Sequence, residues 1–267
     1  MTTDIENMFK DKVLGHPAGL FVLFFTEMWE RFSYYGMRAL LVMFFTASLL
    51  DGGWGWPREH AYAIFGTYTS LVYLSTLLGG YFADKKIGYR YEVVVGALLM
   101  TLGHGAMAVE TPFFIYLGLT LLVFGSGFFK PNMTSIISEM YKGKDEKKDG
   151  AYTIFYMGVN AGAFLGILLC GYLGEQVGWR WGFGLAGVFM LFGLLQFWFA
   201  QNIFGNIGTK PVKVDKEAVE LSADEPKLNP FTSFQLGLIA VAALLGISWI
   251  FNDPISKISE GSYNLFD

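Results

Sequence analysis

The sequence predicts an all-α integral membrane protein: a bundle of six transmembrane helices followed by a seventh apolar helix. Three observations support this prediction, namely the composition, the length of the apolar segments and the distribution of Lys and Arg. Hydrophobic residues make up 53% of the 267 residues and charged residues only 16%, whereas about a quarter of an average soluble protein is charged. The net charge of -4 argues against a nucleic-acid partner, because a phosphate backbone binds to basic surfaces.

Six apolar segments are each long enough to cross a bilayer. A hydrocarbon core of about 30 Å needs roughly 20 residues of helix. Short polar or Gly- and Pro-containing connections separate the segments, which favours antiparallel neighbours. We expect no cleavable signal peptide, because the first apolar run is too long for one and contains charged residues. The predicted spans are Ala18 to Leu49, Ala61 to Ala83, Tyr91 to Val109, Phe113 to Met140, Ala151 to Gly174 and Trp181 to Gln201.

The distribution of Lys and Arg predicts the orientation in the membrane. With six spans, one side of the membrane holds only two basic residues, Arg58 and Arg180. Because basic residues accumulate in cytoplasmic loops, the other side, which includes residues 1–17, is expected to be cytoplasmic. The sequence therefore predicts a multi-pass protein of the cell membrane with a cytoplasmic amino terminus. The thirteen basic residues of that side are Lys10, Lys12, Lys85, Lys86, Arg90, Lys142, Lys144, Lys147, Lys148, Lys210, Lys213, Lys216 and Lys227.

The six-helix bundle is predicted to occupy residues 18–203, and a polar stretch follows it. Residues 204–230 carry mixed charge and several prolines, which indicates a cytoplasmic linker that can hold a short amphipathic helix around Ala218. Residues 231–267 contain a further apolar segment, Leu236 to Phe251, which is short for a span. We interpret it as the start of a linker helix or of a seventh transmembrane helix, and we expect the chain to be truncated there.

Three basic residues remain inside the predicted spans: Arg31, Arg38 and Lys130. A charge at the centre of the bilayer costs about 2.5–3.5 kcal/mol even on the insertion scale, so these side chains must face a paired or water-filled interior. Glu27 precedes Arg31 by four residues, the favourable order for an ion pair within a helix. Protonation of the acid would release the guanidinium. The same helix face carries Glu27, Glu30, Arg31, Tyr34, Tyr35 and Arg38.

Four polar or amphipathic side chains are predicted at one level near the membrane midplane, where secondary transporters place their substrates. Pro131 is expected to bend the helix that carries the lysine of this set. Gly158, Gly162 and Gly166 repeat every four residues, which is typical of a close-packing helix face. The four side chains at the common level are Arg31, Tyr73, Lys130 and Asn160.

Four motifs resemble those of a known transporter family. EMWERFSYYG at Glu27 to Gly36, GFFKPN at Gly127 to Asn132 and FYMGVNAGAF at Phe155 to Phe164 resemble signatures of the proton-dependent oligopeptide transporter family, on its first, fourth and fifth helices. GGYFADKKIGYR at Gly79 to Arg90 resembles the loop motif of the major facilitator superfamily, to which that family belongs. The resemblance covers most of the predicted bundle and implies the amino-terminal half of a protein with two bundles.

The resemblance implies proton-driven symport of di- and tripeptides, with protons as the coupling ion and no bound cofactor or metal. In this scheme Arg31 and Lys130 hold the peptide carboxylate, while Glu27 and Glu30 couple the proton. The carboxyl-terminal six-helix bundle is missing from this chain, so we do not expect the chain to transport alone. The resemblance also implies pocket-lining roles for Tyr34, Tyr35 and Tyr73, a hydrogen bond from Asn160, an accessory role for Arg38, and gating by Asp84, Lys85 and Arg90.

Other functions stay open on the sequence. Arg31 and Lys130 can equally bind nitrate or a small organic anion. A channel or pore subunit also keeps charges inside the membrane. The group of Glu27, Glu30 and Arg31 can instead be a structural ion-pair lock between helices. The sequence contains no Walker A motif, metal-ligand cluster or nucleophile elbow, so we expect neither an ATP-driven pump nor an enzyme.

Overall fold

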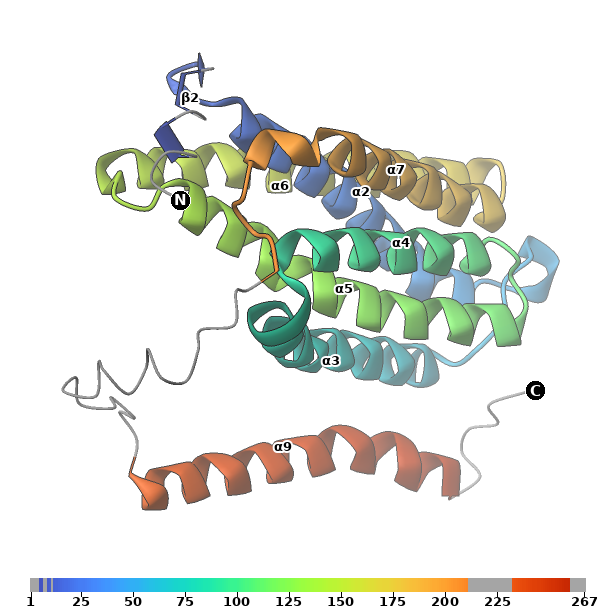
Figure 1. Ribbon diagram of the computed structural model, residues 1–267. Coiled ribbons are helices and arrows are strands. Elements are labelled where there is room, and N and C mark those ends of the chain that lie inside the picture. The colour runs from blue at the N-terminus through green and yellow to red at the C-terminus, as the bar shows by residue number, and fades with distance from the viewer. Residues whose placement is uncertain (1–4, 7–8, 11, 211–231, 260–267) are drawn as a thin grey trace. The chain divides into compact units, whose positions relative to one another are not determined.

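The computed structural model describes residues 5–6, 9–10, 12–210 and 232–259, and helices dominate it (Figure 1). Contacts divide the chain into two units, Met1–Lys210 and Pro211–Asp267. The second unit contains α9 (Ser233–Ser259). The predicted all-α fold is confirmed, while the predicted linker and its amphipathic helix lie largely outside the described residues. The long helices of the first unit are α2 (Ala18–Thr46), α3 (Arg58–Phe82), α4 (Tyr89–Met107), α5 (Pro112–Met140), α6 (Asp145–Gln176) and α7 (Trp179–Ala200).

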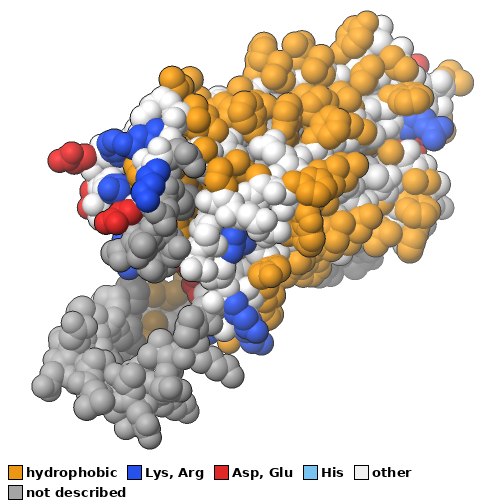
Figure 2. Space-filling model, turned by 45° about the horizontal axis from the view of Figure 1, so that its top comes forward, with side chains coloured by type: hydrophobic (Ala, Val, Ile, Leu, Met, Phe, Trp, Pro, Cys, Tyr) orange, Lys and Arg blue, Asp and Glu red, His pale blue; other side chains and the backbone are white. Residues whose placement is uncertain are grey.

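These six helices pack as two groups, and α2 of the first group also contacts α3 and α5 of the second. α2 packs against α6 and α7, while α5 packs against α3 and α4, and contacts between α4 and α7 join the groups (Figure 1). Phenylalanine, leucine and methionine side chains fill the space between the helices. Hydrophobic side chains also cover the long sides of the bundle, and most of the Lys and Arg visible in Figure 2 gather at one end of it. A surface of this kind suits a hydrocarbon solvent flanked by water.

Small residues let α2 and α6 approach closely. A Cβ added at Gly158 would lie 2.9 Å from the carbonyl oxygen of Phe24, and one at Gly162 or Gly166 would fall on a backbone carbonyl oxygen of α2. The predicted close-packing face of α6 is therefore confirmed. It fixes the position of α2, the helix that carries most of the buried charges, against its neighbour.

Within the described part of the chain, four helices are long and apolar enough, by length and composition, to cross a membrane. α2 is as long as α5, with 29 residues, but Glu27, Glu30, Arg31 and Arg38 make it less apolar. α4 has 19 residues, and its first turn carries polar side chains. The four helices are Arg58–Ile87, Pro112–Met140, Asp145–Gln176 and Trp179–Phe204. Polar residues thus lower the mean hydropathy of α2 and α4, although both helices pack in the same bundle as the other four.

The helix ends differ from the predicted spans where capping and local charge decide them. α2 ends at Thr46, because the Ser48 side chain accepts a hydrogen bond from the backbone of Asp51 in the following 3-10 turn (Leu49–Asp51). α6 begins at Asp145, six residues before the predicted span, with Asp145 and Glu146 in its first turn. Acidic residues there are stabilised by the helix dipole. α9 also exceeds the predicted segment at both ends.

A short antiparallel hairpin precedes the bundle. Strand β1 (Lys12–Val13) pairs with β2 (His16–Pro17), and the two turn residues between them have positive φ angles, as a two-residue hairpin requires. A hydrogen bond of 2.7 Å joins His16 to the hydroxyl of Tyr141 at the end of α5. The ring of Phe9 packs edge-on against the same tyrosine, with 5.6 Å between ring centroids. The sequence did not predict this attachment of the amino-terminal segment.

Candidate functional site

The buried charges of α2 form one compact group. Arg31 Nε donates to Glu27 Oε1 at 2.7 Å and lies 2.9 Å from Glu30 Oε2. Both acids are buried, with exposed fractions of 4% for Glu27 and 0% for Glu30. The predicted ion pair between Glu27 and Arg31 is confirmed. It lies within α2 and does not link two helices, so the structure gives no support to a lock between helices.

The two carboxylates of this group are not fully satisfied. Glu27 Oε2 and both oxygens of Glu30 are buried and make no hydrogen bond to any described residue. One guanidinium therefore faces two acids, which leaves an excess negative charge when both are ionised. A buried charge without compensation is strongly unfavourable. The group therefore favours either a bound proton or a second cation nearby.

Lys130 of α5 supplies that second cation. Its Nζ lies 4.1 Å from the ring centroid of Tyr34 on α2 and 5.9 Å from that of Tyr73 on α3. The guanidinium carbon of Arg31 lies 5.9 Å from the same Tyr34 ring. A cation within about 6 Å of a ring centroid is attracted by the ring face. Three helices thus bring Arg31, Lys130 and two tyrosines together, as the predicted common level requires.

Of the other predicted site residues on α2 and α6, Tyr35 and Arg38 pack against neighbouring rings, whereas Asn160 does not reach the two cations. The ring of Tyr35 packs edge-on against Tyr34 at a centroid distance of 5.4 Å, and the Arg38 guanidinium lies 4.9 Å from the Phe65 ring centroid. Asn160 is exposed, and its amide donates to the carbonyl of Tyr156 within α6. The described contacts therefore do not connect Asn160 to the two cations.

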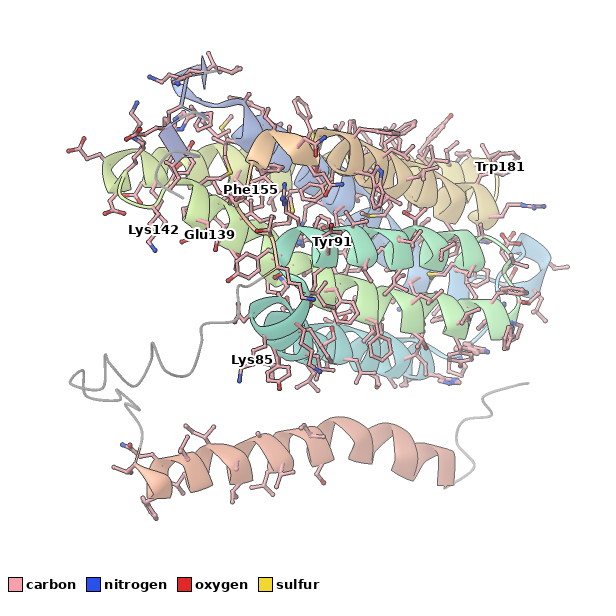
Figure 3. All side chains as sticks on the ribbon, in the orientation of Figure 1. Lys85, Tyr91, Glu139, Lys142, Phe155 and Trp181 are labelled. Carbon is pink, nitrogen blue, oxygen red and sulfur yellow. The ribbon has the colours of Figure 1, made fainter. Side chains whose placement is uncertain are left out.

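The three residues predicted to act as a gate lie at one end of the bundle, away from the buried charges, and no described ion pair joins them. Asp84, in a π-helical turn (Ala83–Ile87), accepts a hydrogen bond of 2.9 Å from Tyr89. Lys85, labelled in Figure 3, lies 5.1 Å from the ring centroid of Tyr81. Arg90 donates to the carbonyl of Gln201 at 2.7 Å.

Arg90 belongs to a contact between the start of α4 and the stretch that follows α7, residues 201–210. The backbone N–H of Arg90 donates to the carbonyl of Gly208 at 3.0 Å. The N–H of Gly208 donates in turn to a carboxylate oxygen of Glu139, near the end of α5, at 2.8 Å. Gly88 leaves no room for a Cβ, which would lie 2.6 Å from the backbone of Thr209. This stretch therefore connects the ends of α4, α5 and α7.

A cavity of about 280 Å³ opens between α3 and α5. The hydroxyls of Tyr68 and Tyr116 on its walls are buried and make no hydrogen bond to a described residue. Sequence reasoning did not single them out, because tyrosine is common in apolar runs; the available signal was a hydroxyl inside a span, which needs a partner. The cavity is lined by Ile64, Thr67, Tyr68, Leu71, Tyr116, Leu119, Thr120, Val123 and Phe124.

A second buried polar contact also escaped the sequence analysis. The Asn132 amide of α5 donates to Glu92 Oε2 of α4 at 2.9 Å, and both side chains are buried. Glu92 is an acid inside a predicted span, so the rule that selected Arg31 applies to it as well. Among the described residues, no group of three or more His, Cys, Asp and Glu side chains is placed to hold a metal ion.

A bundle of apolar helices that buries paired charges at mid-length is the architecture of an integral membrane transport protein. Comparison with known proteins agrees. The family model described as "POT family" matches residues 91–222. The peptide transporter YePEPT of Yersinia enterocolitica is 44% identical over 186 residues, which are 68% of this chain and 36% of that protein. A di-/tripeptide transporter of Lactococcus lactis is 40% identical over 203 residues, 74% of this chain and 40% of that protein.

Solved structures show the same relationship. A crystal structure of a peptide transporter POT in complex with sulfate is 36% identical and has a TM-score of 0.76, over 99% of this chain and 51% of the other. A POT family transporter in complex with 5-aminolevulinic acid is 30% identical with a TM-score of 0.74, over 93% of this chain and 50% of the other. The chain thus spans about two fifths of the curated relatives it matches and about half of the solved structures. The chain is similar to the POT family in sequence and structure, and the match is consistent with an amino-terminal half.

Proposed function

We propose that this chain is the amino-terminal half of a proton-coupled symporter of di- and tripeptides. The observation that carries the proposal is the meeting of Arg31 and Lys130 around Tyr34, beside two buried carboxylates. A guanidinium binds a carboxylate bidentately, while an ammonium adds a point charge. The two cations suit the carboxylate end of a short peptide, and the tyrosine rings suit side chains of different size and polarity.

The acids beside Arg31 provide a route for coupling to protons. In the structure the guanidinium is engaged by Glu27 and Glu30. A proton on either acid weakens that engagement and makes Arg31 available to a peptide carboxylate. Binding then favours the conformation in which the loaded bundle can move against its partner bundle. The coupling ion is the proton, and neither a cofactor nor a catalytic step belongs to this scheme.

A second bundle is expected to complete the site. Tyr73 is 65% exposed and Asn160 is exposed as well, although both belong to helices long and apolar enough to span the bilayer. Polar groups at that depth need a protein-lined or water-filled surrounding. In the proposed protein the missing carboxyl-terminal bundle covers this face and supplies the groups that meet the peptide amine. Asp84, Lys85 and Arg90 act at the cytoplasmic gate.

The proposed orientation places the amino terminus in the cytoplasm. Lys85 and Lys142 lie toward one end of the bundle and Trp181 at the other (Figure 3). The end with Lys142 also carries Lys144, Lys147 and Lys148, around the start of α6. Basic residues favour the cytoplasmic side.

Uptake by the complete transporter in proteoliposomes tests this function. Labelled dipeptide should accumulate when the outside is acidic, and a protonophore should abolish the accumulation. Arg31→Ala and Lys130→Ala should each reduce uptake at least tenfold, while Arg58→Ala, which removes an exposed arginine at the start of α3, should leave it unchanged. Glu27→Gln with full gradient-driven accumulation would exclude Glu27 as a coupling residue. Uptake that is indifferent to pH would contradict symport and favour a channel.

The same two cations suit a second candidate, a carrier of nitrate or of a small organic anion. Competition separates the two functions. If peptides are the substrates, an unlabelled dipeptide should suppress uptake, and its amidated form should compete poorly because it lacks the carboxylate. Competition by nitrate at low concentration, without competition by dipeptides, would support the anion carrier instead.

A further inference from the structure

The Tyr68 hydroxyl is a hydrogen-bond donor and acceptor that has no hydrogen-bond partner among the described residues. The residue is 3% exposed, and its hydroxyl makes no hydrogen bond to a described residue. A buried hydroxyl left without a hydrogen bond is unfavourable, and surrounding hydrocarbon offers it no substitute. This cost suggests that the Tyr68 hydroxyl has a hydrogen-bond partner in another conformation of the protein.

Glu30 is the complementary group on the neighbouring helix. Both of its carboxylate oxygens are buried without a hydrogen bond to a described residue. α2 and α3 face each other here, because the Arg38 guanidinium lies 4.9 Å from the ring centroid of Phe65, three residues before Tyr68. Glu30 lies about two turns before Arg38 on the same face of α2. The charged and titratable groups that surround Glu30 are Glu27, Arg31, Tyr34 and Arg38 of α2, Tyr68 of α3 and Lys130 of α5.

We propose that Tyr68 is a positioning residue that becomes the hydrogen-bond partner of protonated Glu30 when Arg31 leaves. With Arg31 in place, the guanidinium compensates the carboxylate and Tyr68 has no role. When Arg31 turns to a substrate carboxylate, Glu30 would remain as an uncompensated buried charge, so it takes up a proton. A carboxylic acid and a phenol each have a donor and an acceptor, so the O–H of protonated Glu30 can donate to the Tyr68 oxygen and give each group a partner.

Tyr116 provides a matched control. It lies on the opposite wall of the same cavity, and its hydroxyl is likewise buried without a described hydrogen bond. The other α5 residues that line the cavity are Leu119, Thr120, Val123 and Phe124, and none of them is charged. Tyr68→Phe and Tyr116→Phe each delete one hydroxyl and keep the ring, so both should fold. A purely structural role for these hydroxyls would give the two variants similar effects.

The first test uses this chain in lipid nanodiscs and does not depend on transport. Infrared difference spectroscopy follows the carbonyl band of protonated Glu30, assigned by its loss in Glu30→Gln. In Tyr68→Phe the band should shift to the frequency of a carboxylic acid without a hydrogen bond. Tyr116→Phe should leave the band unchanged. An unchanged band in Tyr68→Phe, an equal change in Tyr116→Phe, or no Glu30 band in the unmodified chain would each overturn the inference.

The second test rests on the proposed function and uses uptake by the complete transporter. Tyr68→Phe should change the pH dependence of peptide uptake, while Tyr116→Phe should keep the unmodified profile. A uniform loss at every pH in Tyr68→Phe would indicate a packing defect and contradict the inference. If the unmodified protein takes up no peptide, the proposed function fails, and the infrared test still decides the role of Tyr68.

Discussion

Replacing Gly162 by alanine tests how closely α6 must approach α2 to set up the site. The added methyl would fall on the carbonyl oxygen of Met28 and lie 3.0 Å from Cβ of Arg31. Carbon atoms pack at about 3.5–4.0 Å, so the helices must separate by an amount on the order of 1 Å. Such overpacking typically costs about 1–3 kcal/mol. Alanine is favoured over glycine in a helix by about 1 kcal/mol, so the expected net destabilisation is roughly 0–2 kcal/mol.

Gly171→Ala on the same helix is the control, because nothing lies within 4 Å of a Cβ at that position. It should leave the free energy of unfolding unchanged or raise it by up to about 1 kcal/mol. Equilibrium unfolding in mixed micelles, with a denaturing detergent added to a mild one, measures both variants. If Gly162→Ala and Gly171→Ala unfold at the same detergent fraction, the close contact between α2 and α6 does not contribute as described.

Two further predictions concern the end of the bundle that carries Lys142, Lys144, Lys147 and Lys148. Burial and the charge of Lys147 lower the pKa of His16 below its ordinary value of 6.5. Attachment of the hairpin to Tyr141 is therefore fully stabilised above pH 6.5 and weakens as the pH falls through the lowered pKa. Hydrogen exchange of residues 12–17 should increase below that pKa, and His16→Gln should remove the pH dependence. Arg90→Ala deletes the hydrogen bond to the Gln201 carbonyl and should lower the free energy of unfolding by about 1 kcal/mol, whereas equal stability of the variant in chemical denaturation would show that this contact is dispensable.

The sequence predicted the parts of the molecule that depend on spacing and on the cost of burying charge. The pairing of Glu27 with Arg31 follows from a separation of four residues, and the close contact along α6 follows from its glycine repeat. Both depend on the geometry of one helix, and neither requires the arrangement of the others. The placement of Lys130 near Tyr73 was accessible because both were predicted at the same depth.

Other features depend on contacts between residues distant in the sequence. Whether a tyrosine hydroxyl finds a partner depends on side chains of neighbouring helices, so Tyr68 could not be distinguished from Tyr116. The partner of Arg90 is a backbone carbonyl at Gln201, and a backbone acceptor leaves no sequence signal. The Glu92–Asn132 hydrogen bond joins α4 and α5, and its acid was recognisable whereas its partner was not.

The stretch after α7 has a mechanical consequence. It is bonded to the first turn of α4 and to Glu139 on α5, with Gly88 admitting its backbone at close range. A pull applied along the chain at Lys210 is therefore distributed over three helix ends and does not unwind α7 alone. Motion of the chain beyond Lys210 should therefore be transmitted to the ends of α4, α5 and α7 together.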